Sequence, residues 1–209
     1  MFRNTIIEWS KLHEEELLDY KAYRWKNETY EESVRARNDL EEAIKSSRKK
    51  NDGGIDLATA DKIYRWGFFK PFPTRDEKMV LDATREAFRF LEEGDCYRAC
   101  KRLMQITRGV AGATKILGLS NQEKFCIYDS RVGRALSDLR KDEEKIIRCP
   151  PGRSIKGDYI LYKQYGHERA LDYQKLVWTL EIVHDRLKEK APNSRIADIE
   201  MALFMKGKR

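Results

Sequence analysis

Hydrophobic residues recur at helical spacing through most of the chain. Residues 167–190 place Leu176, Leu180, Val183 and Leu187 at successive steps of 4, 3 and 4, and residues 74–93 repeat this pattern. Such steps put the apolar side chains on one helix face. No segment alternates apolar and polar residues as a half-buried strand does. The pattern therefore predicts an all-α fold in a single domain of residues 1–209.

Capping and breaking residues predict where several helices begin and end. Residues 1–50 contain neither glycine nor proline, which favours an N-terminal extension of one or two long charged helices. Asp56 is expected to cap the next helix, and Thr74 with Glu77 matches a capping box for the helix that ends near Glu93. Residues 194–205 are predicted to form a last amphipathic helix.

The charge of the chain is unevenly distributed. The net charge is +7; residues 1–50 hold 11 Lys and Arg against 11 Asp and Glu, whereas residues 101–165 hold 14 against 7. A local basic excess favours a polyanionic partner, although a plain solvated face would show the same composition.

Membrane and metal functions are not expected. No apolar run approaches the roughly 20 residues that a membrane span needs, and charge appears too early for a signal peptide, so we expect a cytoplasmic protein. The four cysteines fit reduced, buried thiols in that compartment. Cys96 and Cys100 share a helix face, but the chain has no CxxC pair, and no metal site is predicted.

Residues 105–134 contain a predicted turn between two helices. Only "TRGV" separates two helical patterns, and so tight a connection needs positive φ, which Gly109 adopts without strain. The small residues Gly112, Ala113 and Thr114 leave the second helix's N-terminus open to an anion such as a phosphate. Arg108 and Lys115 add positive charge nearby. An ordinary helical hairpin with close packing would have the same features.

Asp129 directly precedes the next helical pattern in this stretch. Aspartate is a preferred N-cap, worth about 1 kcal/mol. The helix dipole also keeps such a carboxylate ionised, so the same residue suits catalysis. Arg131 and Arg134 follow Asp129 by two and five residues, where they could meet phosphates.

These features resemble the helix-hairpin-helix DNA glycosylase superfamily. A short glycine hairpin is followed about twenty residues later by an aspartate that opens a helix. More narrowly, "ATKIL", "YDSRVGRAL" and the ending "IEMALF" are similar to a group of bacterial proteins with an 8-oxoguanine-glycosylase-like fold. The motif match covers about residues 97–140.

The resemblance implies a role for each matching residue. Asp129 matches the catalytic aspartate, which stabilises an oxocarbenium-like transition state and orients water after the base has left the duplex. Gly109 matches the second hairpin glycine. The hairpin would grip a DNA phosphate, with a monovalent cation as its only expected cofactor. The DNA-binding candidates are Thr107, Arg108, Gly109, Val110, Ala111, Gly112, Thr114, Arg131, Arg134 and Arg153.

The hairpin departs from the family pattern at three places. Thr107 replaces the first glycine, and Gln105-Ile106 stands where Leu-Pro is usual. Bifunctional members carry a nucleophilic lysine two residues after the second glycine, where this chain has Ala111. Lys115 lies one turn further on, where a regular helix would point it elsewhere, so a phosphate contact or a solvated lysine is the preferred reading.

Two other segments supply weaker candidates. The stretch "YRWGFFKPF" places Trp66, Phe68, Phe69 and Phe72 on a predicted loop, as base stacking or a strand-separating wedge would require; the rings would equally suit the core. Tyr128 is a further candidate for the base pocket. Arg153 and Lys156 lie in a basic loop that offers backbone contacts or is plain surface.

We therefore predict a monofunctional DNA glycosylase that acts on double-stranded DNA with a damaged or modified base, in the cytoplasm and at the nucleoid when bound. Two alternatives remain. One is a non-catalytic helix-hairpin-helix module in which Asp129 is only a cap. The other is a bifunctional glycosylase/lyase that uses Lys115.

Overall fold

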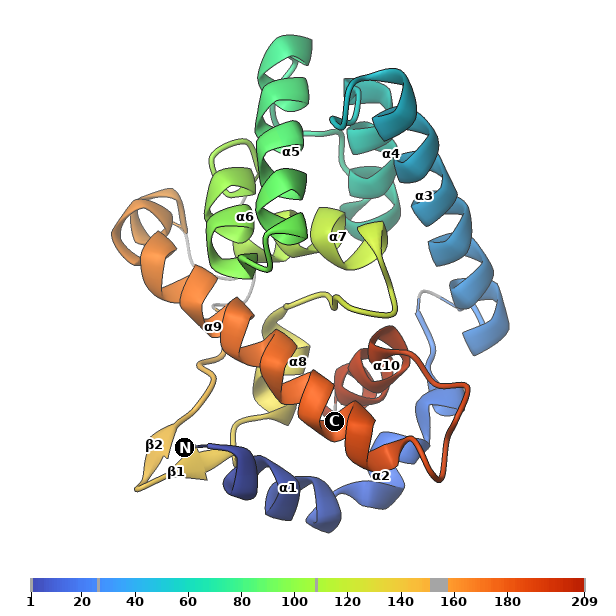
Figure 1. The fold of residues 1–209 in the computed structure, drawn as a ribbon, viewed down its shortest axis with the longest axis vertical. Coiled ribbons are helices and arrows are strands. Elements are labelled where there is room, and N and C mark those ends of the chain that lie inside the picture. Colours follow the sequence, from blue (N-terminus) through green and yellow to red (C-terminus); the bar gives the residue numbers. More distant parts are fainter. Residues whose placement is uncertain (1, 26, 108, 151–157, 209) are drawn as a thin grey trace.

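The computed structural model describes residues 2–25, 27–107, 109–150 and 158–208, with side chains described from residue 166 onward in the last range. The fold is mostly helical (Figure 1). Its helices are α1 (Arg3–Leu12), α2 (Glu14–Leu18), the 3-10 helix η1 (Tyr20–Ala22), α3 (Tyr30–Lys50), α4 (Leu57–Phe68), α5 (Glu77–Glu92), α6 (Cys96–Leu103), α7 (Val110–Ser120), α8 (Ser130–Ala135), α9 (Asp158–Leu187) and α10 (Ile196–Lys206).

The described residues also form a small two-stranded antiparallel sheet, which is a β-hairpin. Strand β1 (Arg140–Lys141) pairs with β2 (Glu144–Lys145), with Arg140 opposite Lys145. Its two turn residues, Asp142 and Glu143, both have positive φ. Strands of two residues are too short to show alternation, which is why the sequence pattern did not predict them.

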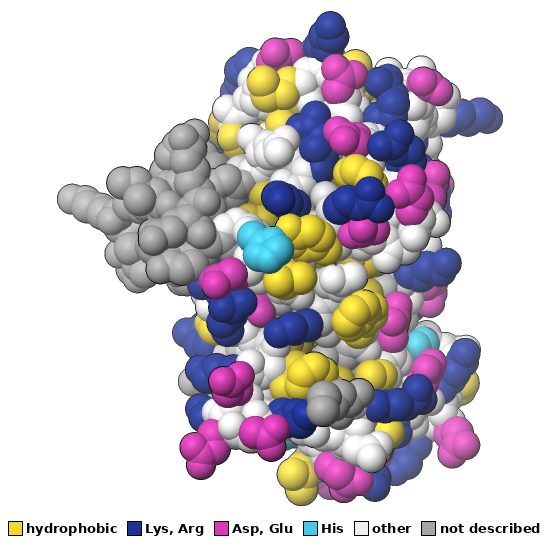
Figure 2. All heavy atoms as spheres, turned by 60° about the vertical axis from the view of Figure 1, so that its left-hand side comes forward, with side chains coloured by type: hydrophobic (Ala, Val, Ile, Leu, Met, Phe, Trp, Pro, Cys, Tyr) yellow, Lys and Arg dark blue, Asp and Glu magenta, His cyan; other side chains and the backbone are white. Residues whose placement is uncertain are grey.

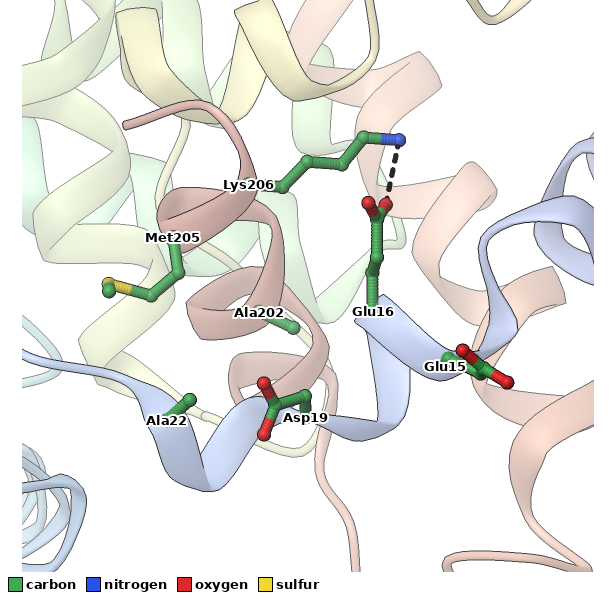
Figure 3. A pocket seen from close by; sticks show the side chains of 7 residues that line it. All are labelled: Glu15, Glu16, Asp19, Ala22, Ala202, Met205 and Lys206. Carbon is green, nitrogen blue, oxygen red and sulfur yellow. Dashed lines mark ion pairs between the residues drawn. The ribbon is translucent and has the colours of Figure 1, made fainter. Parts of the chain in front are cut away.

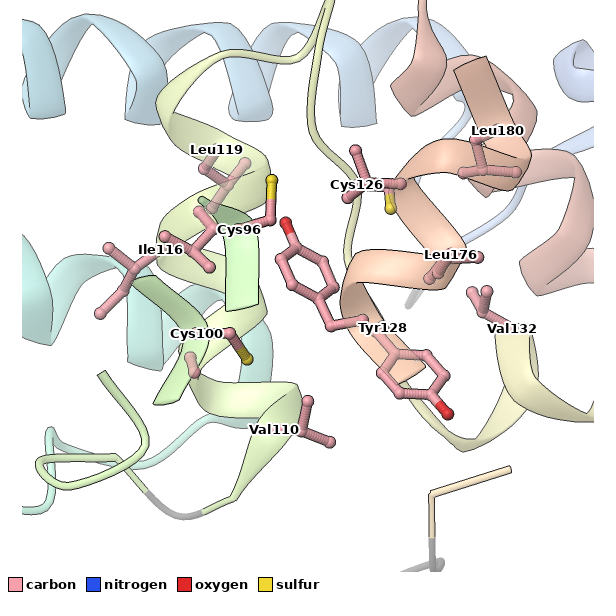
Figure 4. Packing of buried hydrophobic residues seen from close by; sticks show 14 of the residues in the cluster. Cys96, Cys100, Val110, Ile116, Leu119, Cys126, Tyr128, Val132, Leu176 and Leu180 are labelled. Carbon is pink, nitrogen blue, oxygen red and sulfur yellow. The ribbon is translucent and has the colours of Figure 1, made fainter. Parts of the chain in front are cut away.

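The long helix α9 crosses the molecule between two groups of helices (Figure 1). It packs against α6 and α7 on one side and against α1 and α10 on the other. Helix α10 also contacts α8, α2 and η1. In Figure 4, side chains from α6, α7 and α9 meet in the core, among them Cys100, Ile116 and Leu176. No helix in the described ranges has the length and apolarity to span a bilayer.

The N-terminal segment is part of this core. Ile6, Trp9, Leu17, Leu40 and Ile44 are all buried in the main hydrophobic cluster. The expected one or two long helices are wrong: the segment forms α1, α2, η1 and α3. Helix α3 begins at its own capping box, in which the Thr29 hydroxyl accepts from the Glu32 N–H and the Glu32 carboxylate accepts from the Thr29 N–H.

The starts of α4 and α5 were both predicted from capping residues. Asp56 is the N-cap of α4, as predicted, because its carboxylate accepts from the Thr59 N–H. The Thr74–Glu77 capping box is wrong. The Thr74 hydroxyl accepts from the N–H of Asp76, and Asp76 itself caps α5 through the Met79 N–H.

Helix α10 was predicted to be amphipathic, but it is not. Every residue from Ile196 to Phe204 is buried, including Asp198 and Glu200. The helix lies among α8, α2, η1 and α9, so it has no solvent face along this stretch. Its two buried acids are matched by arginines: Asp198 pairs with Arg195 and Glu200 with Arg37.

Candidate active site

The predicted turn between α6 and α7 is present. Gly109 has φ 81° and ψ 178°, which confirms the positive φ expected from the sequence. Its carbonyl accepts from the N–H groups of Gly112 and Ala113 and so starts α7. Thr107, which replaces the family's first glycine, has a role of its own: its buried hydroxyl lies 3.0 Å from the Leu103 carbonyl oxygen and 3.3 Å from that of Gly109.

Most hairpin side chains proposed to contact DNA are inaccessible. Val110, Gly112, Thr107 and Thr114 are buried, whereas Gly109 and Ala111 are partly exposed. A Cβ added to Gly112 would overlap the hydroxyl of Tyr64, so this glycine serves close packing. Any contact of the described hairpin with a phosphate must therefore use backbone near Gly109 and Ala111. Arg108 lies outside the described residues.

Asp129 is the N-cap of α8, as predicted. Its Oδ1 atom accepts from the backbone N–H groups of Arg131 at 2.8 Å and Val132 at 3.1 Å. Among the described residues, no donor hydrogen-bonds to its Oδ2 atom. One oxygen thus fixes the half-buried carboxylate, and the other is available to a ligand or to water.

A hydrogen bond between a backbone N–H and a threonine side chain holds the segment before Asp129 against α7. The Tyr128 N–H donates to the buried Thr114 hydroxyl at 3.0 Å. Gly118 allows this close approach, because a Cβ there would lie 2.7 Å from the backbone carbon of Cys126. Since Thr114 precedes Lys115 and Tyr128 precedes Asp129, this contact brings the two candidate catalytic residues to one region.

Lys115 and Asp129 line the same cavity. Its other lining residues are Tyr23, Trp25, Arg37, Trp66, Ile127, Glu200 and Phe204, and its volume is about 20 Å³. A space of this size holds about one water molecule. The cavity combines aromatic walls with four acidic or basic side chains, which come from α3, α7, α10 and the α8 N-cap.

The expectation that Lys115 would point away from Asp129 is wrong. Lys115 is 6% exposed, so it is not the solvated lysine preferred from the sequence. Its Nζ atom lies 4.6 Å from the centre of the Phe68 ring, a cation–π contact. Gly67 makes room for the lysine stem, because a Cβ at this glycine would overlap Cδ and Cε of Lys115.

A buried ion pair forms another part of the wall. Nη1 of Arg37 lies 2.7 Å from Oε2 of Glu200, and Nη2 lies 3.4 Å from Oε1. Arg37 is 2% exposed and Glu200 is 1% exposed. Burial opposes the charged guanidinium, but the charges and hydrogen bonds of Glu200 and Tyr23 together exceed this effect and raise the pKa of Arg37. Burial raises the pKa of the adjacent Tyr23 to about 12.

Arg131 lies against two aromatic residues of the cavity wall. Its guanidinium carbon is 4.6 Å from the Phe204 ring centre and 5.6 Å from that of Trp25. Arg131 is partly exposed, and Arg134 is exposed on the same short helix. Arg131 therefore lies beside the cavity, and Arg134 is accessible to solvent. Arg153 and Lys156, the other basic candidates, lie outside the described residues.

The predicted aromatic candidates are divided among different places. Trp66 lines the cavity and Phe68 contacts Lys115, but both belong to α4 and not to a loop. Phe72 is buried, whereas Phe69 is 68% exposed with φ 56° directly after α4. Tyr128 is absent from the cavity wall: it is fully buried and its hydroxyl donates to the Arg148 carbonyl.

A larger pocket lies elsewhere and contains none of the predicted residues. It measures about 310 Å³ and is lined by Glu15, Glu16, Asp19, Ala22, Ala202, Met205 and Lys206. Figure 3 shows Lys206 paired with Glu16, at 3.1 Å. Its carboxylates would repel a phosphate backbone, so size alone does not make it the better candidate for DNA chemistry.

Surface charge is mixed on the face drawn in Figure 2. Lys and Arg side chains alternate there with Asp and Glu and with small hydrophobic areas. Several basic residues of the 101–165 excess are paired with acids, for example Arg102 with Glu86 and Arg148 with Asp172. The sequence count therefore overstates the positive charge that is available to a polyanion.

Three of the four cysteines are buried free thiols. Cys96, Cys100 and Cys126 are buried and unpaired by disulfides, and burial raises the pKa of Cys96 to about 11. Within the described ranges, His, Cys, Asp and Glu side chains form no group of three that could hold a metal ion.

The sequence did not predict most of the side chains that line the cavity. Tyr23, Trp25, Arg37, Ile127, Glu200 and Phe204 were not predicted. Glu200 gave one usable signal, because it stands within the apolar run "IEMALF", where a buried acid needs a partner. Arg37 gave a second signal, because it stands three residues before Leu40 and seven before Ile44 and so shares the buried face of α3 with them.

Comparisons with protein-family models, curated proteins and solved structures found no match.

Proposed function

We propose that this protein is a DNA glycosylase with a helix-hairpin-helix glycosylase-like arrangement, acting on a damaged or modified base. The main support is that Asp129 and Lys115 line one aromatic-walled cavity. In the sequence, the Gly109 hairpin and Asp129 are two separate indications of a DNA glycosylase. Their residues are joined by the Tyr128–Thr114 hydrogen bond, so the hairpin helix and the carboxylate form one unit.

Asp129 supplies the central chemical step in this proposal. Cleavage of a glycosidic bond develops positive charge on the sugar, and a fixed carboxylate lowers the energy of that transition state. The two backbone N–H groups that bind Oδ1 hold the carboxylate in position. Oδ2 then faces the substrate charge or orients the water that attacks the sugar.

A flipped base requires more space than this cavity offers. The present volume of about 20 Å³ suits one water molecule. Trp25 is the wall residue on which we expect opening to depend, because it lies in the non-helical segment between η1 and α3. Stacking between Trp25, Trp66 and Phe204 would then replace the stacking lost from the duplex.

A second candidate, a glycosylase/lyase, is favoured by the burial of Lys115. An amine held in the same cavity as Asp129 is placed to attack the sugar and form a Schiff base after base loss. The lysine comes from a different position than in the bifunctional enzymes that the hairpin resembles. The two candidates share base release and differ in strand cleavage.

The decisive experiment is a screen for base release. Duplexes carrying single oxidised, deaminated, alkylated or hypermodified bases are incubated with excess protein, and the strands are analysed with and without alkali. A hydrolytic glycosylase gives breaks only after alkali, whereas a lyase also gives them without it. A protein that binds these duplexes and releases no base would be the binding module instead.

A further inference from the structure

The ion pair of Arg37 and Glu200 has an unused donor in the cavity wall. Both Nη atoms of Arg37 face Glu200 oxygens, but the buried Nε–H has no hydrogen-bond partner among the described residues. A buried donor without a partner costs free energy comparable to a lost hydrogen bond. Such a group at a cavity wall calls for an acceptor on whatever occupies the cavity.

A purely structural role accounts for only part of this arrangement. The pair joins α3 to α10 across 163 residues of sequence, and it would serve as a cross-link. However, apolar side chains of similar volume usually stabilise such a contact as well or better, because burying two charges is costly. The pair also leaves the Nε–H of Arg37 without a partner, in a side chain that lines the cavity.

The surroundings of Arg37 fit a planar aromatic ligand. Its guanidinium carbon is 5.5 Å from the Trp66 ring centre and 5.7 Å from that of Tyr23. Both rings line the cavity with Arg37 itself, and so do Trp25 and Phe204. The cavity of about 20 Å³ must first open, as proposed above, to admit a heteroaromatic ring. A ring stacked there would then have its polar edge within reach of the wall, where one donor contacts one ring position.

We propose that Arg37, positioned by Glu200, is the residue that selects the base, by donating its Nε–H to a ring carbonyl oxygen. This inference rests on the proposed function for the identity of the ligand. A base with an amino group at the same ring position presents a second donor to Nε–H. The cavity therefore takes 6-keto purines and 4-keto pyrimidines in preference to their amino counterparts.

Free nucleosides test this selection apart from any DNA chemistry. Binding of 2′-deoxyinosine and 2′-deoxyadenosine, which differ as keto and amino purines, is measured by tryptophan fluorescence and by saturation-transfer NMR. Deoxyuridine and deoxycytidine form the second pair. The wild-type protein should bind each keto member about 10- to 100-fold more tightly, the range for a hydrogen bond to a charged group.

The double variant Arg37→Met/Glu200→Met removes the donor and, because both charges of the pair are removed, leaves neither partner as an unpaired buried charge. It should bind both members of each pair with affinities within about twofold of each other. The control Arg102→Met/Glu86→Met removes an interhelical ion pair away from the cavity, and it should keep the wild-type preference. Thermal melting verifies that all three proteins are folded.

Three outcomes would overturn the proposal: equal wild-type affinity for keto and amino members, no detectable nucleoside binding at millimolar concentration, or a preference that survives in the double variant. Base release from duplex DNA is scored independently. Keto selectivity without base release would reject the glycosylase activity and retain the proposed role of Arg37 in base selection. Base release without keto selectivity would retain the glycosylase activity and reject that role of Arg37.

Discussion

Lys115 of α7 and Asp129, the N-cap of α8, line the same small cavity. Each has a different anchor: Asp129 is fixed by two backbone N–H groups, and Lys115 lies with its ammonium over the Phe68 ring. The two groups can therefore be altered separately, which makes the proposed chemistry testable one residue at a time.

Replacing Asp129 by Asn should abolish base release and leave the fold intact. Asn is as good an N-cap as Asp, so the melting temperature should stay close to that of the wild type. The negative charge is lost, and a loss of only 3 kcal/mol of transition-state stabilisation slows a reaction about a hundredfold. Single-turnover base release on the best duplex of the screen is the measurement. Wild-type rates in the folded variant would leave Asp129 as a helix cap alone.

Lys115 decides between the hydrolytic and the lyase mechanisms. In the lyase, borohydride reduction during turnover links the wild-type protein covalently to DNA, and Lys115→Ala gives no adduct. The control Lys124→Ala changes an exposed lysine outside the cavity and should leave the adduct yield unchanged. A wild-type protein that releases base but forms no adduct would rule out the Schiff base.

Gly109→Val should weaken binding to duplex DNA. A β-branched residue opposes φ 81° and ψ 178°, a conformation open almost only to glycine, and we expect a loss of about 1–3 kcal/mol of folding stability. The control Gly94→Val introduces strain at another positive φ, 78°, between α5 and α6. Fluorescence anisotropy at low and moderate salt should find weaker binding for Gly109→Val alone. Equal affinity of the two variants would remove the hairpin from the DNA interface.

Arg37→Met should be strongly destabilising, because Glu200 is then a buried charge without its partner. Breaking a buried pair costs about 3–5 kcal/mol, and each kcal/mol lowers the melting temperature of a domain of this size by roughly 2–4 °C. Arg37→Met/Glu200→Met should melt closer to the wild type than the single variant does. Lys45→Met, which breaks an exposed pair with Glu42, should cost at most about 1 kcal/mol. A single variant as stable as Lys45→Met would contradict the buried pair.

Features that depend on neighbours along the chain could be predicted from the sequence. The positive φ of Gly109 and the N-caps at Asp56 and Asp129 follow from steric and hydrogen-bonding demands within a few residues. The helical periodicity gave the mostly helical fold for the same reason. Where two local partners competed, as Thr74 and Asp76 did for the start of α5, the prediction failed by a few residues.

The set of side chains that line the cavity depends on contacts between helices that are distant in the sequence. Lys115 is buried because Gly67 of another helix leaves room for its stem, and Arg37 is buried because Glu200 offsets its charge from the far end of the chain. The pattern within α3 or α10 does not encode either partner. Burial of a charged side chain depends on what the rest of the fold brings to it, since its desolvation must be balanced by a specific opposite charge or donor.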